Sequence, residues 1–290
     1  MATRTWQGGT GGSTTDYSVA GNWVEGAVPI AGDAVTIRPN PDGTVYNITA
    51  GLNQAGVAVT SFVIDASYDG DIGASGGYLL LNVTTDVAIN GNGDMFIDCS
   101  AANLLELSVR MDLSTAGHLY WKGPTVTAAY LHRGAMTHVS GTISTCYVSL
   151  VDAETQSSDM NLTWTAGTAT AMVILGGTTE MNGGTWTDTT QTNGEVTIVN
   201  GSAASIIQRG GTLDYRSATT LTLLQVYGLT ADFTCGNDIR PKTITTIYAR
   251  GTPTLDLDNG SDTITFTNGV SILGSPTITW PRSLRAMDWA

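Results

Sequence analysis

Carboxylate side chains gather in one short stretch near the end of the chain. Asp256, Asp258 and Asp262 fall within seven residues, and Asn259 and Gly260 stand between them. Carboxylate and amide oxygens around a glycine turn are the ligands that Ca²⁺ takes in loop-type sites. The spacing differs from that of an EF-hand loop, and the distal Glu is missing. The stretch is a calcium candidate, and ordinary Asx-turn chemistry accounts for the same residues without an ion.

Catalytic chemistry on a sugar chain needs a more complete set of groups. A hydrolase needs two carboxyl groups that converge on one bond, and a lyase needs a basic group that removes a proton. Asp256 and Asp258 share one face of a strand by their i, i+2 spacing. However, the chain has no Asp-Asp pair, no His-Gly and only two lysines. Arg240-Pro241-Lys242 alone matches the Arg-x-Lys pattern of pectinase-type hydrolases. We therefore expect a protein that is not an enzyme.

The negative net charge of the chain limits the kinds of molecule that it can bind. The 290 residues include 12 Lys and Arg against 25 Asp and Glu, which gives a net charge of −13. A surface of this sign repels nucleic-acid phosphates and anionic lipids, so we expect no nucleic-acid or membrane partner. Charged residues make up 13% of the chain, about half of the usual ~25%. With 35 glycines, this composition favours stacked strands joined by tight turns over long helices.

The targeting and cysteine signals fit synthesis in a reducing cytoplasm. Residues 1–12 contain no apolar signal-peptide core, and no run of 18 apolar residues occurs anywhere. We therefore expect neither a signal peptide nor a membrane span. The three cysteines, Cys99, Cys146 and Cys235, are odd in number and widely separated. This pattern predicts buried thiols without a disulfide framework or a zinc site.

Short β-branched runs recur along most of the chain, and a turn signal follows each of them. The first apolar residues of successive runs are Val83, Leu104, Val126, Val148, Val173, Val196, Leu221, Ile244 and Ile264. From Val83 to Ile264 the eight steps cover 181 residues, a mean of about 22.6 residues per step. That step is too short for a βαβ unit of ~30 residues or a propeller blade of ~40. It fits one coil of a solenoid.

The repeat predicts an all-β fold, a single-stranded parallel β-helix (solenoid) of roughly ten coils. Each coil is expected to hold about 22–23 residues, and coils stack ~4.8 Å apart so that their backbones pair. The common phase predicts that Val173, Val196, Leu221 and Ile244 form one inward column.

Both ends of the chain depart from the repeat, and a solenoid must cover its end strands. We divide the chain into an N-terminal cap or docking segment (residues 1–35), a solenoid (residues 36–279) and a C-terminal cap or tail (residues 280–290). Either end could instead dock a larger partner. The docking candidates combine arginine with tryptophan, a residue type enriched at interface hot spots. They are Arg4, Trp6 and Trp23 at one end, and Arg282, Arg285 and Trp289 at the other.

The N-terminal segment resembles the opening segment of β-helix proteins from tailed-phage genomes and from bacterial surface or autotransporter-like passengers. The resemblance rests on Thr5–Gly9, Gly21–Trp23, Val28-Pro29 and Gly32–Ile37, which read TWQGG, GNW, VP and GDAVTI. Two inner runs, TAAYLHRG from Thr127 and GGTLDYRS from Gly210, look like the repeats of the phage-borne members. Phage members begin at Met without a signal peptide, as this chain does, whereas secreted passengers normally carry one.

The resemblance implies a structural protein of a tailed-phage virion. Such a protein would decorate the capsid or project from it, to stabilise the shell or mediate adhesion. It would do so as a homotrimer bound to the major capsid protein or another virion protein. The alternatives are a tailspike or surface adhesin that binds a host surface glycan and, less favoured, a β-helix polysaccharide depolymerase. For the alternatives, Trp164 and Trp186 could stack on sugar, although packing within the wall explains them as well.

Overall fold

The computed structural model describes residues 2–9, 13–112, 117–151, 159–261 and 264–281. The protein is all-β, with one short 3₁₀ helix, η1 (Ala20–Asn22), among the described residues. The strands are β1 (Thr3–Trp6), β2 (Ala34–Ile37), β3 (Asn53–Ile64), β4 (Leu79–Ile89), β5 (Met95–Asp98), β6 (Leu104–Arg110), β7 (Leu119–Val148), β8 (Met160–Trp164), β9 (Thr168–Ile174), β10 (Thr178–Met181), β11 (Thr185–Gln191), β12 (Glu195–Ile198), β13 (Ser202–Gln208), β14 (Gly211–Tyr215), β15 (Thr220–Gly228), β16 (Ala231–Thr234), β17 (Lys242–Gly251), β18 (Thr254–Asp256), β19 (Ile264–Phe266), β20 (Val270–Gly274) and β21 (Thr277–Thr279).

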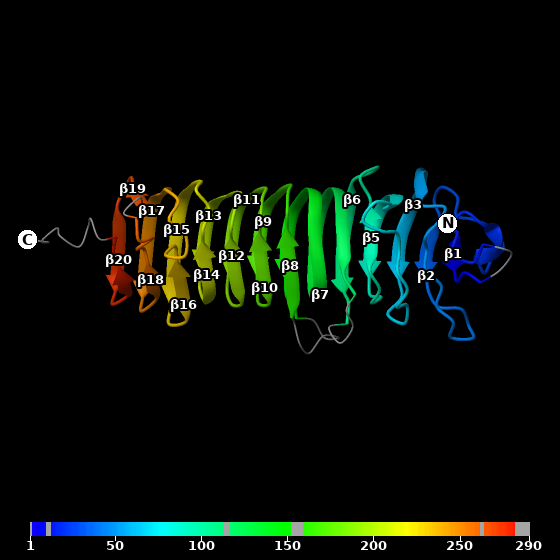
Figure 1. Cartoon of the computed structure of the whole chain (residues 1–290), viewed down its shortest axis with the longest axis horizontal. Coiled ribbons are helices and arrows are strands. Elements are labelled where there is room, and N and C mark those ends of the chain that lie inside the picture. The colour runs from blue at the N-terminus through cyan, green and yellow to red at the C-terminus, as the bar shows by residue number, and fades with distance from the viewer. Residues whose placement is uncertain (1, 10–12, 113–116, 152–158, 262–263, 282–290) are drawn as a thin grey trace, which may run out of the picture.

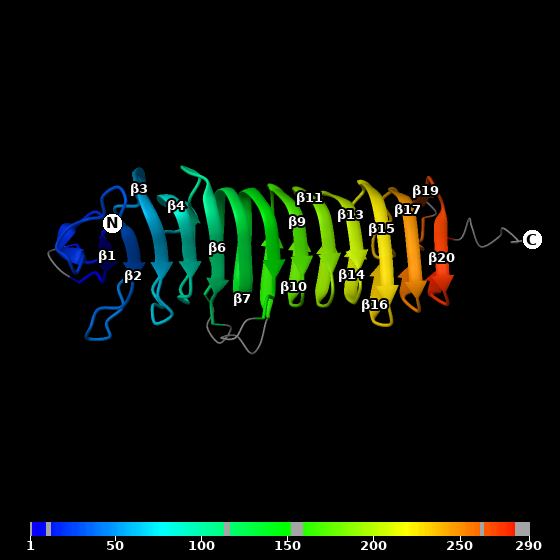
Figure 2. The same ribbon diagram turned by 180° about the vertical axis from the view of Figure 1, so that it is seen from behind.

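Every ladder between these strands is parallel, and most join strands that are two apart in the chain. β11 pairs with β9 on one side and with β13 on the other. The strands between them form a second ladder, in which β10 pairs with β8 and β12. The strands consequently lie in rows along the long axis of the molecule, from β1 near the N-terminus to β20 and β21 at the far end (Figures 1 and 2).

The length of chain between register partners is not constant. It is short in the middle of the molecule, where Asp188 pairs with Ala171 before it and with Ser205 after it. Towards the C-terminal end the interval is longer, as between Leu223 and Thr246. At the N-terminal end it is longer still, as between Thr3 and Ala34. The mean repeat length predicted from the sequence is therefore an average over short repeats in the middle and longer repeats at the ends.

The variable repeat corrects the predicted column of core residues. Leu221 and Ile244 do pair and are both buried. Val173 instead pairs with Thr190 and lies half-buried on the wall. Val196 is buried, but it belongs to the other ladder, opposite Thr179. The prediction assumed that every repeat has the mean length. Because the middle repeats are shorter, positions one mean step apart do not face each other there.

The core is one continuous apolar cluster that extends from Trp6 to Ile264. Large and small side chains alternate along it. Trp186 is fully buried, and its register partners in the neighbouring repeats are Ala169 and Ala203. Close packing in protein interiors requires such matched volumes, because a cavity or an overlap costs stability. The three cysteines are buried free thiols, as predicted.

Glycines at the turns let successive repeats approach each other. Gly167, Gly184 and Gly201 all have positive φ, at 94°, 82° and 90°. A Cβ on Gly201 would lie 2.6 Å from the carbonyl oxygen of Gly184, and one on Gly184 would overlap that of Gly167. Only glycine adopts this backbone conformation without a steric cost. The turn glycines thus allow the repeats to stack at strand spacing.

Replacement of Leu221 by Asp should unfold the stack. The change buries an unpaired carboxylate in the core, which we expect to lower the free energy of unfolding by more than about 3 kcal/mol. Thr222→Asp is the matched control, because Thr222 is the exposed next residue of the same strand. Thermal melting by circular dichroism measures both. Equal melting temperatures for the two variants would contradict the inward placement of Leu221.

His138 should make the stability of the stack depend on pH. Its ring is buried and stacks on Trp164 with ring centroids 3.7 Å apart. Nδ1 donates to the carbonyl oxygen of Ala166, 3.0 Å away, while Nε2 has no hydrogen-bond partner in the described part of the chain. Burial therefore disfavours the charged ring and lowers the pKa of His138 from 6.5 to about 4.

Between pH 6.5 and 4 the unfolded chain binds a proton at His138 that the folded chain does not. The free energy of unfolding should therefore fall as pH decreases through this window, by at most about 3 kcal/mol from this group. In the variant His138→Gln, urea unfolding at several pH values should show a shallower decline over the same window. Parallel pH curves for the parent and the variant would contradict this assignment.

Candidate functional site

The two N-terminal tryptophans predicted as docking anchors lie inside the fold. Trp6 and Trp23 are 0% and 2% exposed. The Trp23 indole Nε1 donates to the carbonyl oxygen of Tyr17 at 2.9 Å, and the Tyr17 and Trp23 rings meet edge to face at 4.8 Å. Trp6 similarly contacts Tyr68 edge to face. These indoles plug the N-terminal end of the core, so their interpretation as surface anchors for a partner is corrected.

Arg4 is also engaged within the N-terminal segment. Its Nε donates to Asp33 Oδ2 at 2.8 Å, and Asp33 also accepts the backbone N–H groups of Ala2 and Ile30. The hydrogen bond from Arg4 holds the pKa of the Asp33 carboxyl below its usual value. Arg4 therefore ties β1 to the segment before β2, which is a capping role.

The C-terminal docking candidates Arg282, Arg285 and Trp289 lie outside the described residues. Trp280, just before them, is partly buried and packs against the core. The docking role of this tail therefore stays a prediction.

The carboxylates of the calcium candidate organise the local backbone. Asp256 Oδ1 accepts the N–H of Asp258 at 3.2 Å, and Asp258 Oδ1 accepts the N–H of Gly260 at 2.9 Å. Asp262 lies outside the described residues. Among the residues that are described, no three His, Cys, Asp or Glu side chains form a group that could hold a metal ion. The Asx-turn interpretation accounts for the contacts of Asp256 and Asp258 seen here.

Arg240 and Lys242, which matched a hydrolase pattern by spacing, bind the protein itself. Lys242 is almost fully buried, and its Nζ donates to the carbonyl oxygens of Asp238 and Arg240 at 2.7 and 3.1 Å. The Arg240 guanidinium donates to the Asp238 carboxylate at 2.5 Å and to the carbonyl oxygens of Val199 and Arg216. One cation thus joins the turns of three successive repeats. Trp164 and Trp186 are both fully buried, so neither ring is exposed for sugar stacking.

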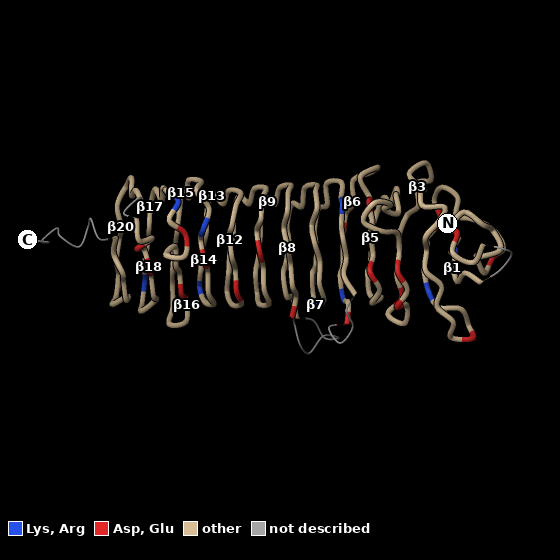
Figure 3. Tube along the Cα trace, viewed as in Figure 1, with Lys and Arg blue, Asp and Glu red and all other residues tan. Residues whose placement is uncertain are grey.

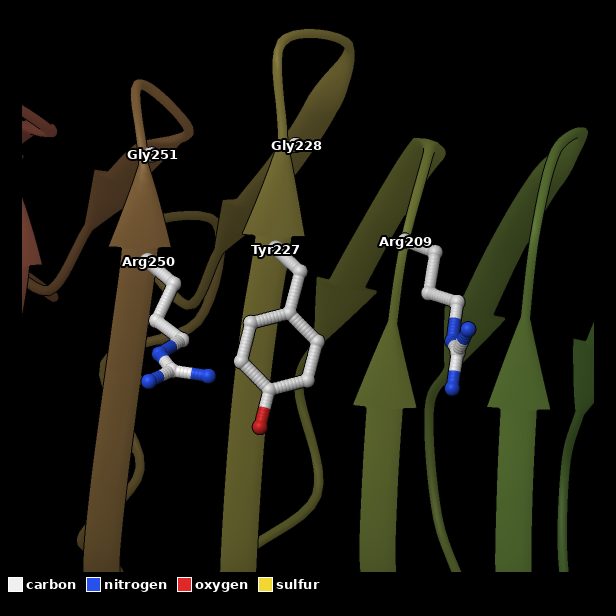
Figure 4. Close-up of a pocket in the computed structure, with 5 residues that line it drawn as sticks. All are labelled: Arg209, Tyr227, Gly228, Arg250 and Gly251. Atoms are coloured by element: carbon white, nitrogen blue, oxygen red, sulfur yellow. The ribbon is translucent and has the colours of Figure 1, made fainter.

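The described wall does carry a cationic and aromatic cluster that the sequence patterns did not single out. Arg209 follows β13, Tyr227 lies in β15 and Arg250 lies in β17, so the three residues come from successive repeats. Tyr227 and Arg250 are register partners. With Gly228 and Gly251 they line a shallow depression of about 500 Å³. Figure 4 shows the three side chains on one face, with the Tyr227 ring between the two guanidinium groups. We call these three residues the Arg–Tyr patch.

The charge around the Arg–Tyr patch is unusual for this chain. Five of the twelve basic residues lie between positions 209 and 250, around β13 to β17 (Figure 3). Arg216, Arg240 and Lys242 are ion-paired with Asp214 or Asp238. The exposed guanidinium groups of Arg209 and Arg250 have no ion pair within the described residues. The patch therefore presents two uncompensated positive charges on an acidic protein.

The tyrosine of the Arg–Tyr patch is held in place. Its hydroxyl donates to Gln225 Oε1 at 2.8 Å, which fixes the ring along the strand. A second depression continues from Tyr227 and Arg250 to Tyr248 and Leu273, which are 42% and 60% exposed. The residues of this surface occupy outward-facing positions of successive β-branched runs, and that is the sequence signal for it. To recognise them as neighbours, one needs the register of each repeat, and the mean repeat length from the sequence does not give that register.

The chain matches no known family model, no curated protein and no solved structure. Over the described ranges, the structure contains no helix of the length and apolar character needed to cross a membrane.

Trp23→Ala should destabilise the N-terminal cap. The change removes a fully packed indole and its hydrogen bond, at an expected cost of about 3–5 kcal/mol. Val24→Ala is the control, because Val24 is 47% exposed, and it should melt within a few degrees of the parent. Differential scanning calorimetry measures both. An unchanged melting temperature for Trp23→Ala would contradict the capping role of Trp23 and favour its role as a docking anchor.

Proposed function

We propose that the chain is a parallel β-solenoid that serves as a rigid, non-catalytic structural element of a tailed-phage virion. The observation that carries the proposal is the uninterrupted succession of parallel ladders from β1 to β21. In a solenoid each coil buries its apolar face only against its neighbours, so the coils act together as one rod. A rod of this kind suits a part that projects from, or lies along, a particle.

Capping and surface charge support this role. The N-terminal end is plugged by Trp6, Tyr17 and Trp23. The backbone of β1 there already pairs with residues 22–24, as where Val24 N–H donates to the Thr5 carbonyl at 2.9 Å, which disfavours strand addition at that edge. The net charge of −13 keeps free copies apart and soluble before assembly. The N-terminal segment that forms this cap is the one that resembles the opening segment of phage-borne β-helix proteins. We propose a homotrimer as the assembled form, bound to the major capsid protein or another virion protein.

A second candidate function is a carbohydrate-binding tailspike or adhesin. It is favoured by the Arg–Tyr patch, because a half-buried tyrosine between two exposed arginines offers a ring face and two anion-binding groups in one place. Both functions use the same rod, and they differ in where the protein stands on the particle.

Quantitative mass spectrometry of purified particles tests the virion assignment. We expect the chain to co-purify with the major capsid protein through a density gradient, at hundreds of copies for capsid decoration. A few copies would place it at the tail and favour the adhesin. Absence from purified particles of a phage that expresses the gene would contradict both. Light scattering on the isolated protein tests the trimer, and a monomer in solution together with single copies in the particle would contradict it.

A further inference from the structure

We propose that the Arg–Tyr patch binds an acidic polysaccharide, with sugar carboxylates on Arg209 and Arg250 and a sugar ring against Tyr227. Binding of this kind deepens the adhesive role in the proposed function and rests on that function for its biological setting. The ligand class follows from three properties of the patch, which are its charge, its shape and its aromatic ring.

Charge indicates an anionic ligand. The neighbouring cations are neutralised within the protein, as Arg216 Nη2 is by Asp214 Oδ2 at 2.7 Å. Arg209 and Arg250 are exposed and lack such a counter-ion within the described residues. A guanidinium group binds a carboxylate through two parallel hydrogen bonds, which makes arginine the side chain suited to this recognition. Two such groups on one face define two anion positions.

The spacing and shape indicate an extended ligand. Arg209 and Arg250 are separated by one intervening strand, that of Tyr227, so they lie two strand spacings apart, about 10 Å. The depression between them is shallow and open, whereas sites for compact small molecules enclose most of the ligand. Gly228 and Gly251 also line it and have no side chains, so a polymer can approach the backbone closely there. A polymer lying across the strands would reach both arginines.

The ring indicates a sugar between the two anion positions. Tyr227 is half-buried and its hydroxyl is held by Gln225. Its ring is thus fixed before binding, which lowers the conformational entropy lost when a ligand packs against it. The C–H groups on the face of a pyranose ring match an aromatic surface, while the carboxylates on either side reach the arginines. A peptide of acidic residues alone would use the arginines but offers no comparable apolar face for the ring.

Calorimetric titration of the full chain with polygalacturonate oligosaccharides tests the site. We expect binding at low ionic strength that weakens as salt is added, since exposed charges are screened. Arg209→Gln and Arg250→Gln should each weaken binding, and together by at least tenfold, and Tyr227→Ala should weaken it at unchanged charge. Arg38→Gln is the matched control, because Arg38 is an exposed arginine at the other end of the molecule, and it should bind like the parent. A neutral galactan oligosaccharide of equal length should not bind.

Several results would overturn the assignment. One is that the parent binds no polygalacturonate, and another is that the double variant binds as well as the parent. Equal loss in Arg38→Gln would show general charge attraction. Equally tight binding of polyglutamate would show an anion site without sugar recognition. These measurements use isolated protein, so their failure leaves the particle location untouched, and absence from particles would leave a measured glycan affinity standing.

Discussion

Parallel hydrogen bonding between strands one repeat apart is the interaction on which the rest of the structure depends. No repeat can bury its own apolar face, so each strand gains its backbone partners and its core contacts from the repeats before and after it. Stacking at strand spacing requires turns that do not project towards their neighbours. The glycines at 167, 184 and 201 meet that requirement at one turn, and the cation of Arg240 joins the turns at another.

The stacked register also explains which polar groups the interior accepts. Gln191 and Gln208 are register partners with no exposed surface, and each side-chain amide nitrogen donates to two backbone carbonyl groups, one three residues further along the chain and one about a repeat further on. Burial of an amide is costly unless it is hydrogen-bonded. The backbone carbonyls supply acceptors for both amide nitrogens, whereas the two amide oxygens have no hydrogen-bond partner among the described residues. On the outside the same register places side chains from distant parts of the chain in rows. The Arg–Tyr patch is one such row, which no single repeat contains.

The sequence predicted the all-β class, the buried cysteines and the inward pair Leu221 and Ile244, because β-branched runs and turn glycines are local signals. It misplaced Val173 and Val196, since a mean period cannot reveal that the middle repeats are shorter than the later ones. Trp6 and Trp23 are predicted docking anchors from sequence alone, because tryptophans beside glycines occur both in the caps of solenoids and in protein interfaces. The sequence did not reveal the Arg–Tyr patch, because its three residues come from three different repeats. They become neighbours only through the register between the strands, which a mean repeat length does not predict.

Disulfide formation between introduced cysteines tests the register most directly. Thr190 and Ile207 are partners on adjacent strands and are half-buried on the wall, within the range of Cα separations of about 4.4–6.8 Å that a disulfide spans. The variant Thr190→Cys with Ile207→Cys should form a cross-link under mild oxidation. Val173→Cys with Ile207→Cys, two strands and about 10 Å apart, should not. Cross-linking of the second pair in preference to the first would contradict the stacked parallel register.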